Sequence, residues 1–189
     1  MRKKIVVFDV DDSLVVTESK IYITNTLTGD KFGLTTSEFA TYKHTPHDMF
    51  DFSDFRNVNL LKAGRLIEWV FNILKRSIEK QIPVGIITAR DNSNLIIDFL
   101  EHNDVRIDHR YIFAVNEPDK GFVGKNTADR KKEAFIKLIE IGFTDFIFYD
   151  DDENNINIAK TVPINFPNIT MKTYHIKDTL VNHKTYRRK

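Results

Sequence analysis

Apolar residues along the chain follow two alternating patterns. Short continuous apolar runs predict strands buried on both faces of a sheet, at residues 5–10, 84–88, 111–115 and 146–149. Apolar residues at helical spacing predict helices at about residues 60–80, 92–102, 127–141 and 156–160, with Thr127 as the cap of the third. Strands that alternate with helices indicate an α/β fold, a three-layer α/β/α sandwich around a parallel sheet.

One region breaks this alternation, because residues 17–59 are polar and rich in aromatic side chains. The sequence Thr28-Gly29-Asp30 predicts a turn between strands at 21–27 and 31–35, so we expect a β-hairpin flap followed by a loop or short helix. We therefore expect a single domain over residues 1–189 with a small insertion at about 17–59. The last residues, 184–189, are basic and are expected to fray.

The composition excludes several kinds of chemistry. The chain has no cysteine, which excludes disulfides, thiolate catalysis and cysteine-based zinc sites. A net charge of +1 does not attract nucleic acid to the whole molecule, so any such affinity needs a local basic patch. The sequence shows neither the apolar region of a signal peptide nor a run of roughly 18 apolar residues, so we expect a cytoplasmic protein without a membrane partner.

Acidic residues follow the first and the last of the predicted strands. Asp9 and Asp11 come after the first strand, and Asp150 and Asp151 come at the end of the last. Because the carboxyl ends of parallel strands meet at one edge of a sheet, these carboxylates are expected to gather there. Gathered carboxylates repel one another unless a cation neutralises them, and oxygen ligands favour Mg²⁺. We therefore expect Asp9, Asp150, Asp151 and the backbone carbonyl of Asp11 to hold Mg²⁺.

The same residues suggest a reaction at phosphorus. Asp9 is the first carboxylate after the strand and can attack phosphorus to give an aspartyl-phosphate. Asp11 would protonate the leaving group and then activate water. Thr88, at the end of the second predicted strand, offers its hydroxyl to the phosphoryl oxygens, and a lysine is expected to neutralise the remaining charge.

These motifs resemble those of the haloacid dehalogenase superfamily. The sequence Asp-Val-Asp-Asp-Ser-Leu at 9–14 resembles motif I, where Thr usually stands at Ser13 and Gly often stands at Asp12. Ile-Ile-Thr-Ala-Arg at 86–90 is similar to motif II, and the pattern Asp-Asp-x-x-x-Asn at 150–155 is similar to motif IV. The resemblance covers nearly the whole chain and implies a Mg²⁺-dependent phosphatase with this fold.

Motif III is a single lysine, and Lys125, Lys131 and Lys132 are all candidates. The setting of Lys131 resembles that in the phosphatase domain of phage polynucleotide kinase-phosphatase, so Lys131 is favoured and Lys125 comes second. The same resemblance implies that Arg90 and Lys20 help to bind the substrate phosphate, with Lys125 as a further substrate-binding residue.

The substrate remains open at this stage. By resemblance, a small insertion implies large or exposed phosphoesters, and we expect a nucleic-acid end, specifically a 3′-phosphate. A basic and aromatic rim would support this, formed by Lys20, Lys43, Arg56 and Arg90 with Tyr42, Phe50, Phe52 and Phe55. The alternatives are a mononucleotidase or other small-molecule phosphatase, and a non-catalytic phosphate-binding protein.

Several of these residues also have simple structural explanations. Asp12 and Asp152 are typical turn formers or helix caps, and Thr88 alone is typical of a turn stabilised by its hydroxyl. Arg90 could pair with a neighbouring acid at the surface. The aromatic cluster of the insertion, with His44 and His47, could pack a loop instead of contacting substrate.

Overall fold

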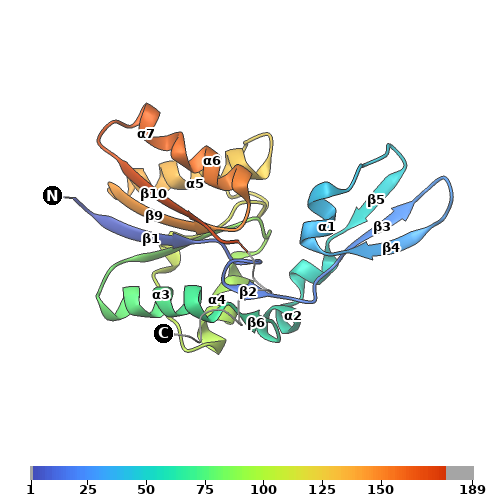
Figure 1. The fold of residues 1–189 in the computed structure, drawn as a ribbon, viewed down its shortest axis with the longest axis horizontal. Coiled ribbons are helices and arrows are strands. Elements are labelled where there is room, and N and C mark those ends of the chain that lie inside the picture. Colours follow the sequence, from blue (N-terminus) through green and yellow to red (C-terminus); the bar gives the residue numbers. More distant parts are fainter. Residues whose placement is uncertain (1, 178–189) are drawn as a thin grey trace.

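Five parallel strands form the central sheet, in the order β10-β9-β1-β7-β8. Figure 1 labels three neighbours of this sheet, β10, β9 and β1. The computed structural model describes residues 2–177, so the basic end at 184–189 lies outside the described residues. The strands are β1 (Lys4–Phe8), β7 (Val84–Thr88), β8 (Ile112–Ala114), β9 (Asp145–Asp150) and β10 (Thr170–His175). Strand β10 was not predicted, because it lies at the sheet edge and its residues are only partly buried.

Helices cover both faces of this sheet and give two separate cores. They are α3 (Glu68–Glu79), α4 (Ser93–His102), α5 (Thr127–Glu140), α6 (Glu153–Lys160) and α7 (Val162–Asn165). From β1, Val6 and Phe8 pack on the face covered by α3 and α4, whereas Ile5 and Val7 pack on the face covered by α5 and α6. This alternation confirms the predicted three-layer α/β/α architecture.

The predicted helix at 60–80 is interrupted. In its place are α2 (Val58–Lys62), β6 (Arg65–Leu66) and α3, and β6 pairs with β2 (Val15–Val16). Gly64 explains the break, because a Cβ there would lie 2.5 Å from Val15 Cγ2 and 3.0 Å from the carbonyl oxygen of Val16. A glycine lets the backbone approach β2 this closely, and the continuing apolar periodicity conceals the interruption.

Helix α5 begins with a different cap from the one predicted. Asn126 is the N-cap, and its side chain accepts a hydrogen bond from the backbone N–H of Asp129. Thr127 is therefore the first residue of the helix, and the prediction of Thr127 as the cap is wrong. Asparagine and threonine both serve as caps, so the residue types alone do not choose between them.

Residues 17–59 contain a second, three-stranded antiparallel sheet with the order β4-β3-β5 (Figure 1). Its elements are β3 (Ile21–Asn25), β4 (Lys31–Leu34), α1 (Thr36–Thr41), β5 (Asp48–Asp51) and the 3₁₀ helix η1 (Ser53–Arg56). Strands β3 and β4 form the predicted hairpin, whereas β5 was not predicted. The ring of Phe39 packs against His44, Phe50 and Phe52. Among residues 2–177, no helix is both long and apolar enough to cross a lipid bilayer.

Candidate active site

Three aspartates lie together at the carboxyl ends of β1 and β9. The two strands are neighbours, with Phe8 paired to Tyr149, so Asp9 and Asp150 leave the sheet side by side. One carboxylate oxygen from each of Asp9, Asp150 and Asp151 lies within 4.8 Å of the others. An all-oxygen set of this size fits a hard divalent cation such as Mg²⁺.

The ammonium group of Lys131 joins two of these carboxylates. Its Nζ donates to Asp9 Oδ1 at 2.8 Å and to Asp150 Oδ2 at 2.7 Å, from the second turn of α5. The side chain is only 2% exposed. Burial alone would lower the pKa of Lys131, but the charges of Asp150 and Asp9 outweigh it and raise this pKa, so Lys131 stays cationic.

The carboxylates carry more negative charge than one lysine neutralises. Burial raises the pKa of Asp9 well above its usual value; Lys131 opposes this shift, and Asp150 and Asp151 add to it. Burial, together with the charge of Asp150, raises the pKa of Asp151 to about 7. A divalent cation held by these oxygens would relieve the repulsion.

Arg90 contacts Asp11 instead of pointing toward open space. Its Nε donates to Asp11 Oδ2 at 2.9 Å, and its Nη2 donates to Asp11 Oδ1 at 2.7 Å. Its Nη1 donates to the backbone carbonyl of Phe55 at 2.6 Å. The guanidinium is bound by a neighbouring acid, and the predicted role of Arg90 in phosphate binding stays a prediction. This pairing is partly buried, with the Arg90 side chain 1% exposed and the Asp11 side chain 18% exposed.

Thr88 is fully buried at the end of β7. Its Oγ1 accepts a hydrogen bond from the backbone N–H of Arg90 at 3.3 Å, which is the local turn anticipated as the structural alternative. The contact holds the Thr88 hydroxyl next to the residues that follow β7. Its predicted role toward a phosphoryl group stays a prediction.

Comparison with known proteins identifies the fold. No protein-family model and no curated protein matches the chain. Solved structures of the HAD domain of effector protein Lem4 from Legionella pneumophila do match it. One has a TM-score of 0.50 and 20% identity, and the match covers 93% of this chain and 86% of that one. An inactive mutant of that domain has a TM-score of 0.51 and 20% identity. This match covers 94% of this chain and 87% of that one. The chain has the haloacid dehalogenase (HAD) fold.

The turn after β1 contains one residue with unusual backbone geometry. Asp12 has a φ of 54°, a left-handed conformation that glycine adopts most readily and that Asp tolerates. Its carboxylate accepts a hydrogen bond from the Thr36 hydroxyl at the start of α1. Asp152 accepts from the backbone N–H of Asn154 and caps α6. Asp12 therefore forms a turn and Asp152 caps a helix, which are the simple structural roles expected for these two residues.

Two further side chains donate hydrogen bonds to these carboxylates, and neither was among the site residues predicted from the sequence. Ser13 is fully buried, and its Oγ donates to Asp151 Oδ1 at 3.2 Å. Asn155 Nδ2 donates to both carboxylate oxygens of Asp150, at 3.1 and 3.2 Å. Their places in motifs I and IV were the available signal, since Ser13 holds the usual Thr position and Asn155 ends the Asp-Asp-x-x-x-Asn pattern.

Two predicted substrate-binding lysines lie on exposed surfaces. Lys125 is exposed in the segment that precedes α5. Lys20 is exposed on the insertion, where its backbone N–H donates to Asp54 Oδ2. Hydrogen bonds from Thr35, with a smaller contribution from the charge of Lys20, lower the pKa of Glu38. Lys131, not Lys125, is the lysine that contacts the carboxylates.

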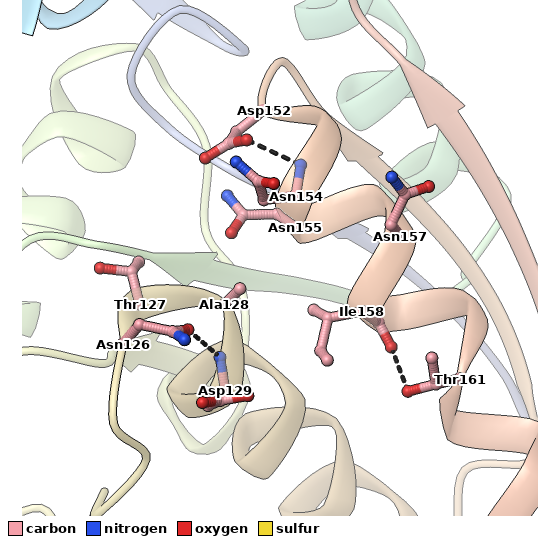
Figure 2. A pocket seen from close by; sticks show the side chains of 10 residues that line it. All are labelled: Asn126, Thr127, Ala128, Asp129, Asp152, Asn154, Asn155, Asn157, Ile158 and Thr161. Atoms are coloured by element: carbon pink, nitrogen blue, oxygen red, sulfur yellow. Dashed lines mark hydrogen bonds between the residues drawn. The ribbon is translucent and has the colours of Figure 1, made fainter. Parts of the chain in front are cut away.

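An open pocket lies beside α6, and none of Asp9, Asp150, Asp151 and Lys131 lines it. It has a volume of about 600 Å³ and lies between the first turn of α5 and one side of α6, from Asp152 to Thr161. Figure 2 shows Asn126 and Thr127 on one side of it and Asn154 and Asn155 on the other. Asn155 also contacts Asp150, so polar groups continue from the cluster into the pocket.

Asp151→Asn is expected to stabilise the metal-free protein. The folded-state pKa of Asp151, about 7, lies above the unfolded value of about 3.9, so the folded state binds more protons between these two values. Stability of the metal-free protein should therefore fall as pH rises from about 4 to 7. Removing the charge should restore on the order of 2 kcal/mol at pH 8, or about 4–8 °C in Tm.

Calorimetry at pH 5 and pH 8, with EDTA or with Mg²⁺, measures this effect. The variant should gain little at pH 5, and Mg²⁺ should raise the Tm of the unmodified protein more than that of the variant. Asp152→Asn is the matched control, because asparagine also caps helices. A lower Tm for Asp151→Asn in EDTA at pH 8 would contradict the predicted repulsion.

Proposed function

We propose that this protein is a Mg²⁺-dependent phosphomonoester hydrolase that acts through an aspartyl-phosphate on Asp9. One observation carries the proposal: buried Lys131 binds the carboxylates of Asp9 and Asp150 at the strand edge, with Asp151 beside them. A cation beside a nucleophilic carboxylate attracts the negatively charged phosphoryl group and stabilises the charge that develops on it in the transition state.

The first chemical step transfers the phosphoryl group to Asp9. A carboxylate oxygen of Asp9 forms a bond to phosphorus while the bond from phosphorus to the leaving-group oxygen breaks. Asp11 gives its proton to that oxygen, so the alcohol leaves neutral. Lys131, and the hydroxyl of Thr88 at the end of β7, hold the phosphoryl oxygens.

The second step returns the protein to its starting state. Asp11 takes a proton from water, the water oxygen bonds to phosphorus, and the bond between Asp9 and phosphorus breaks. Inorganic phosphate leaves, and both carboxyl groups are restored. Asp9, Asp150, Asp151 and the backbone carbonyl of Asp11 would hold Mg²⁺, which when bound supplies positive charge against the phosphate and the crowded carboxylates.

As substrate we propose a nucleic-acid end that carries a 3′-phosphate. The insertion, at about residues 17–59, is small, which supports a large or exposed phosphoester as the substrate. On the insertion, the ring of Phe52 packs against Phe39 and Phe50 but is still 42% exposed, so its exposed part is available for stacking on a base. Tyr42 is hydrogen-bonded to Asp48, and Phe55 packs against Arg90, so these two rings already have partners.

The test compares a 3′-phosphorylated oligonucleotide with the matching 3′-mononucleotide, in Mg²⁺ at low and moderate salt. We expect kcat/KM to be at least about 10-fold higher on the oligonucleotide and to fall with salt, because basic side chains contact the flanking phosphates. Phe52→Ala should reduce this advantage. Equal or better efficiency on the mononucleotide, with no salt dependence, would reject the nucleic-acid substrate and favour a nucleotidase.

A further inference from the structure

We propose that Arg90 is a positioning residue that aims Asp11 at the leaving group and makes this aim depend on the insertion. The inference rests on the proposed function, in which Asp11 gives a proton to the leaving-group oxygen. In this proposal Arg90 holds Asp11 and contacts the insertion, and it does not bind the substrate phosphate.

The first part of the argument is the two-point contact with Asp11. Both oxygens of Asp11 accept from Arg90, at 2.9 and 2.7 Å, from a guanidinium whose side chain is 1% exposed. A planar fork bound through two oxygens prevents the carboxyl group from rotating. The fork uses one lone-pair site on each oxygen, and a second lone-pair site remains on each of them.

The second part is the connection to the insertion. Nη1 of Arg90 donates to the carbonyl oxygen of Phe55 at 2.6 Å, and the guanidinium carbon lies 5.4 Å from the centre of the Phe55 ring. The next residues of both segments are also paired, because Arg56 Nε lies 2.7 Å from Asp91 Oδ2. Two consecutive residues of η1 thus bind two consecutive residues that follow β7, so a shift of η1 would move Arg90 and, with it, Asp11.

This arrangement predicts a selective defect. An alkyl phosphate releases a poor leaving group that needs a proton, whereas p-nitrophenyl phosphate releases a stable anion that does not. Misplacing Asp11 should therefore slow alkyl phosphates far more than p-nitrophenyl phosphate. A residue that only bound phosphate, or only stabilised the fold, would affect both substrates alike.

The experiment measures kcat/KM of Arg90→Lys on β-glycerophosphate and on p-nitrophenyl phosphate in Mg²⁺. Lysine keeps the charge but cannot form the fork, and the ratio of the two efficiencies should fall by about 10–100-fold, out of the roughly 10²–10⁴ that a general acid contributes. The matched control is Arg110→Lys, which breaks an exposed pairing of the same kind with Asp108 and should leave the ratio unchanged.

Phe55→Ala removes the ring that packs against the Arg90 guanidinium but keeps the backbone carbonyl that accepts from Nη1, and it decides the matter if Arg90→Lys does not fold. It should lower the ratio in the same direction, by a smaller factor. In an Asp11→Asn background, Arg90→Lys should change the ratio no further, because the two residues act as one unit.

Equal losses on both substrates, an unchanged ratio in Arg90→Lys and Phe55→Ala, or a further fall in the Asp11→Asn background would each overturn the role of Arg90. Failure of the proposed function looks different, because the unmodified protein would then hydrolyse neither substrate with Mg²⁺, or Asp9→Asn would hydrolyse both normally. Either result would overturn the inference as well.

Discussion

Replacing Asp9 by asparagine is expected to lower turnover by at least about four orders of magnitude, as loss of a nucleophile does in other hydrolases. The amide has the shape of the carboxylate but lacks the charge that attacks phosphorus. Its oxygen can still accept from Lys131, so the fold should survive. Turnover of p-nitrophenyl phosphate in Mg²⁺ measures the effect, with circular dichroism as the check on folding.

Asp152→Asn is the matched control for this prediction. It makes the same chemical change at the same edge of the sheet, on a residue that caps α6. Its turnover should stay within about threefold of the unmodified protein, because asparagine caps helices as well as aspartate does. Near-normal activity of Asp9→Asn would mean that another group attacks phosphorus.

Lys131→Ala is expected to have the second largest effect. Turnover should fall by about 10²–10³, because one charged donor to the developing phosphoryl charge is lost. The free energy of unfolding should also fall by about 3 kcal/mol, because Asp9 and Asp150 lose their buried cation. Parallel measurements of turnover and urea unfolding test both parts.

Lys125→Ala provides the comparison. Lys125 is exposed, so its loss should change the unfolding free energy by less than about 0.5 kcal/mol and should affect turnover less than Lys131→Ala. The reverse ranking in turnover would move the motif III role to Lys125. The two variants differ by one lysine each, so the net charge of both proteins is the same.

The sheet and the place of the carboxylates were predictable, because both depend on local patterns. Continuous apolar runs identify buried strands, and parallel strands bring their carboxyl ends to one edge, so Asp9 and Asp150 had to be neighbours once the order was known. Strand β5 was missed because Asp48 and Asp51 at its ends are poor strand formers.

The target of Arg90 was not predictable from the sequence. Its fork joins residues 79 positions apart, and both a phosphate and a carboxylate satisfy a guanidinium. The outcome depends on where η1 places the carbonyl of Phe55, which is a tertiary property of the insertion. Similarly, Lys131 differs from Lys125 only through its position in α5, from which Nζ reaches Asp9 and Asp150.

The central claim is that Asp9 receives the phosphoryl group. Beryllium trifluoride mimics a phosphoryl group on a carboxylate, so a crystal soaked with it and with Mg²⁺ tests the claim directly. We predict density for the mimic bonded to an Asp9 carboxylate oxygen, a metal ion held beside it by Asp150, and neither feature in Asp9→Asn. Density for the mimic on another residue, or an Asp9 carboxylate that stays unmodified while the metal is bound, would contradict the account.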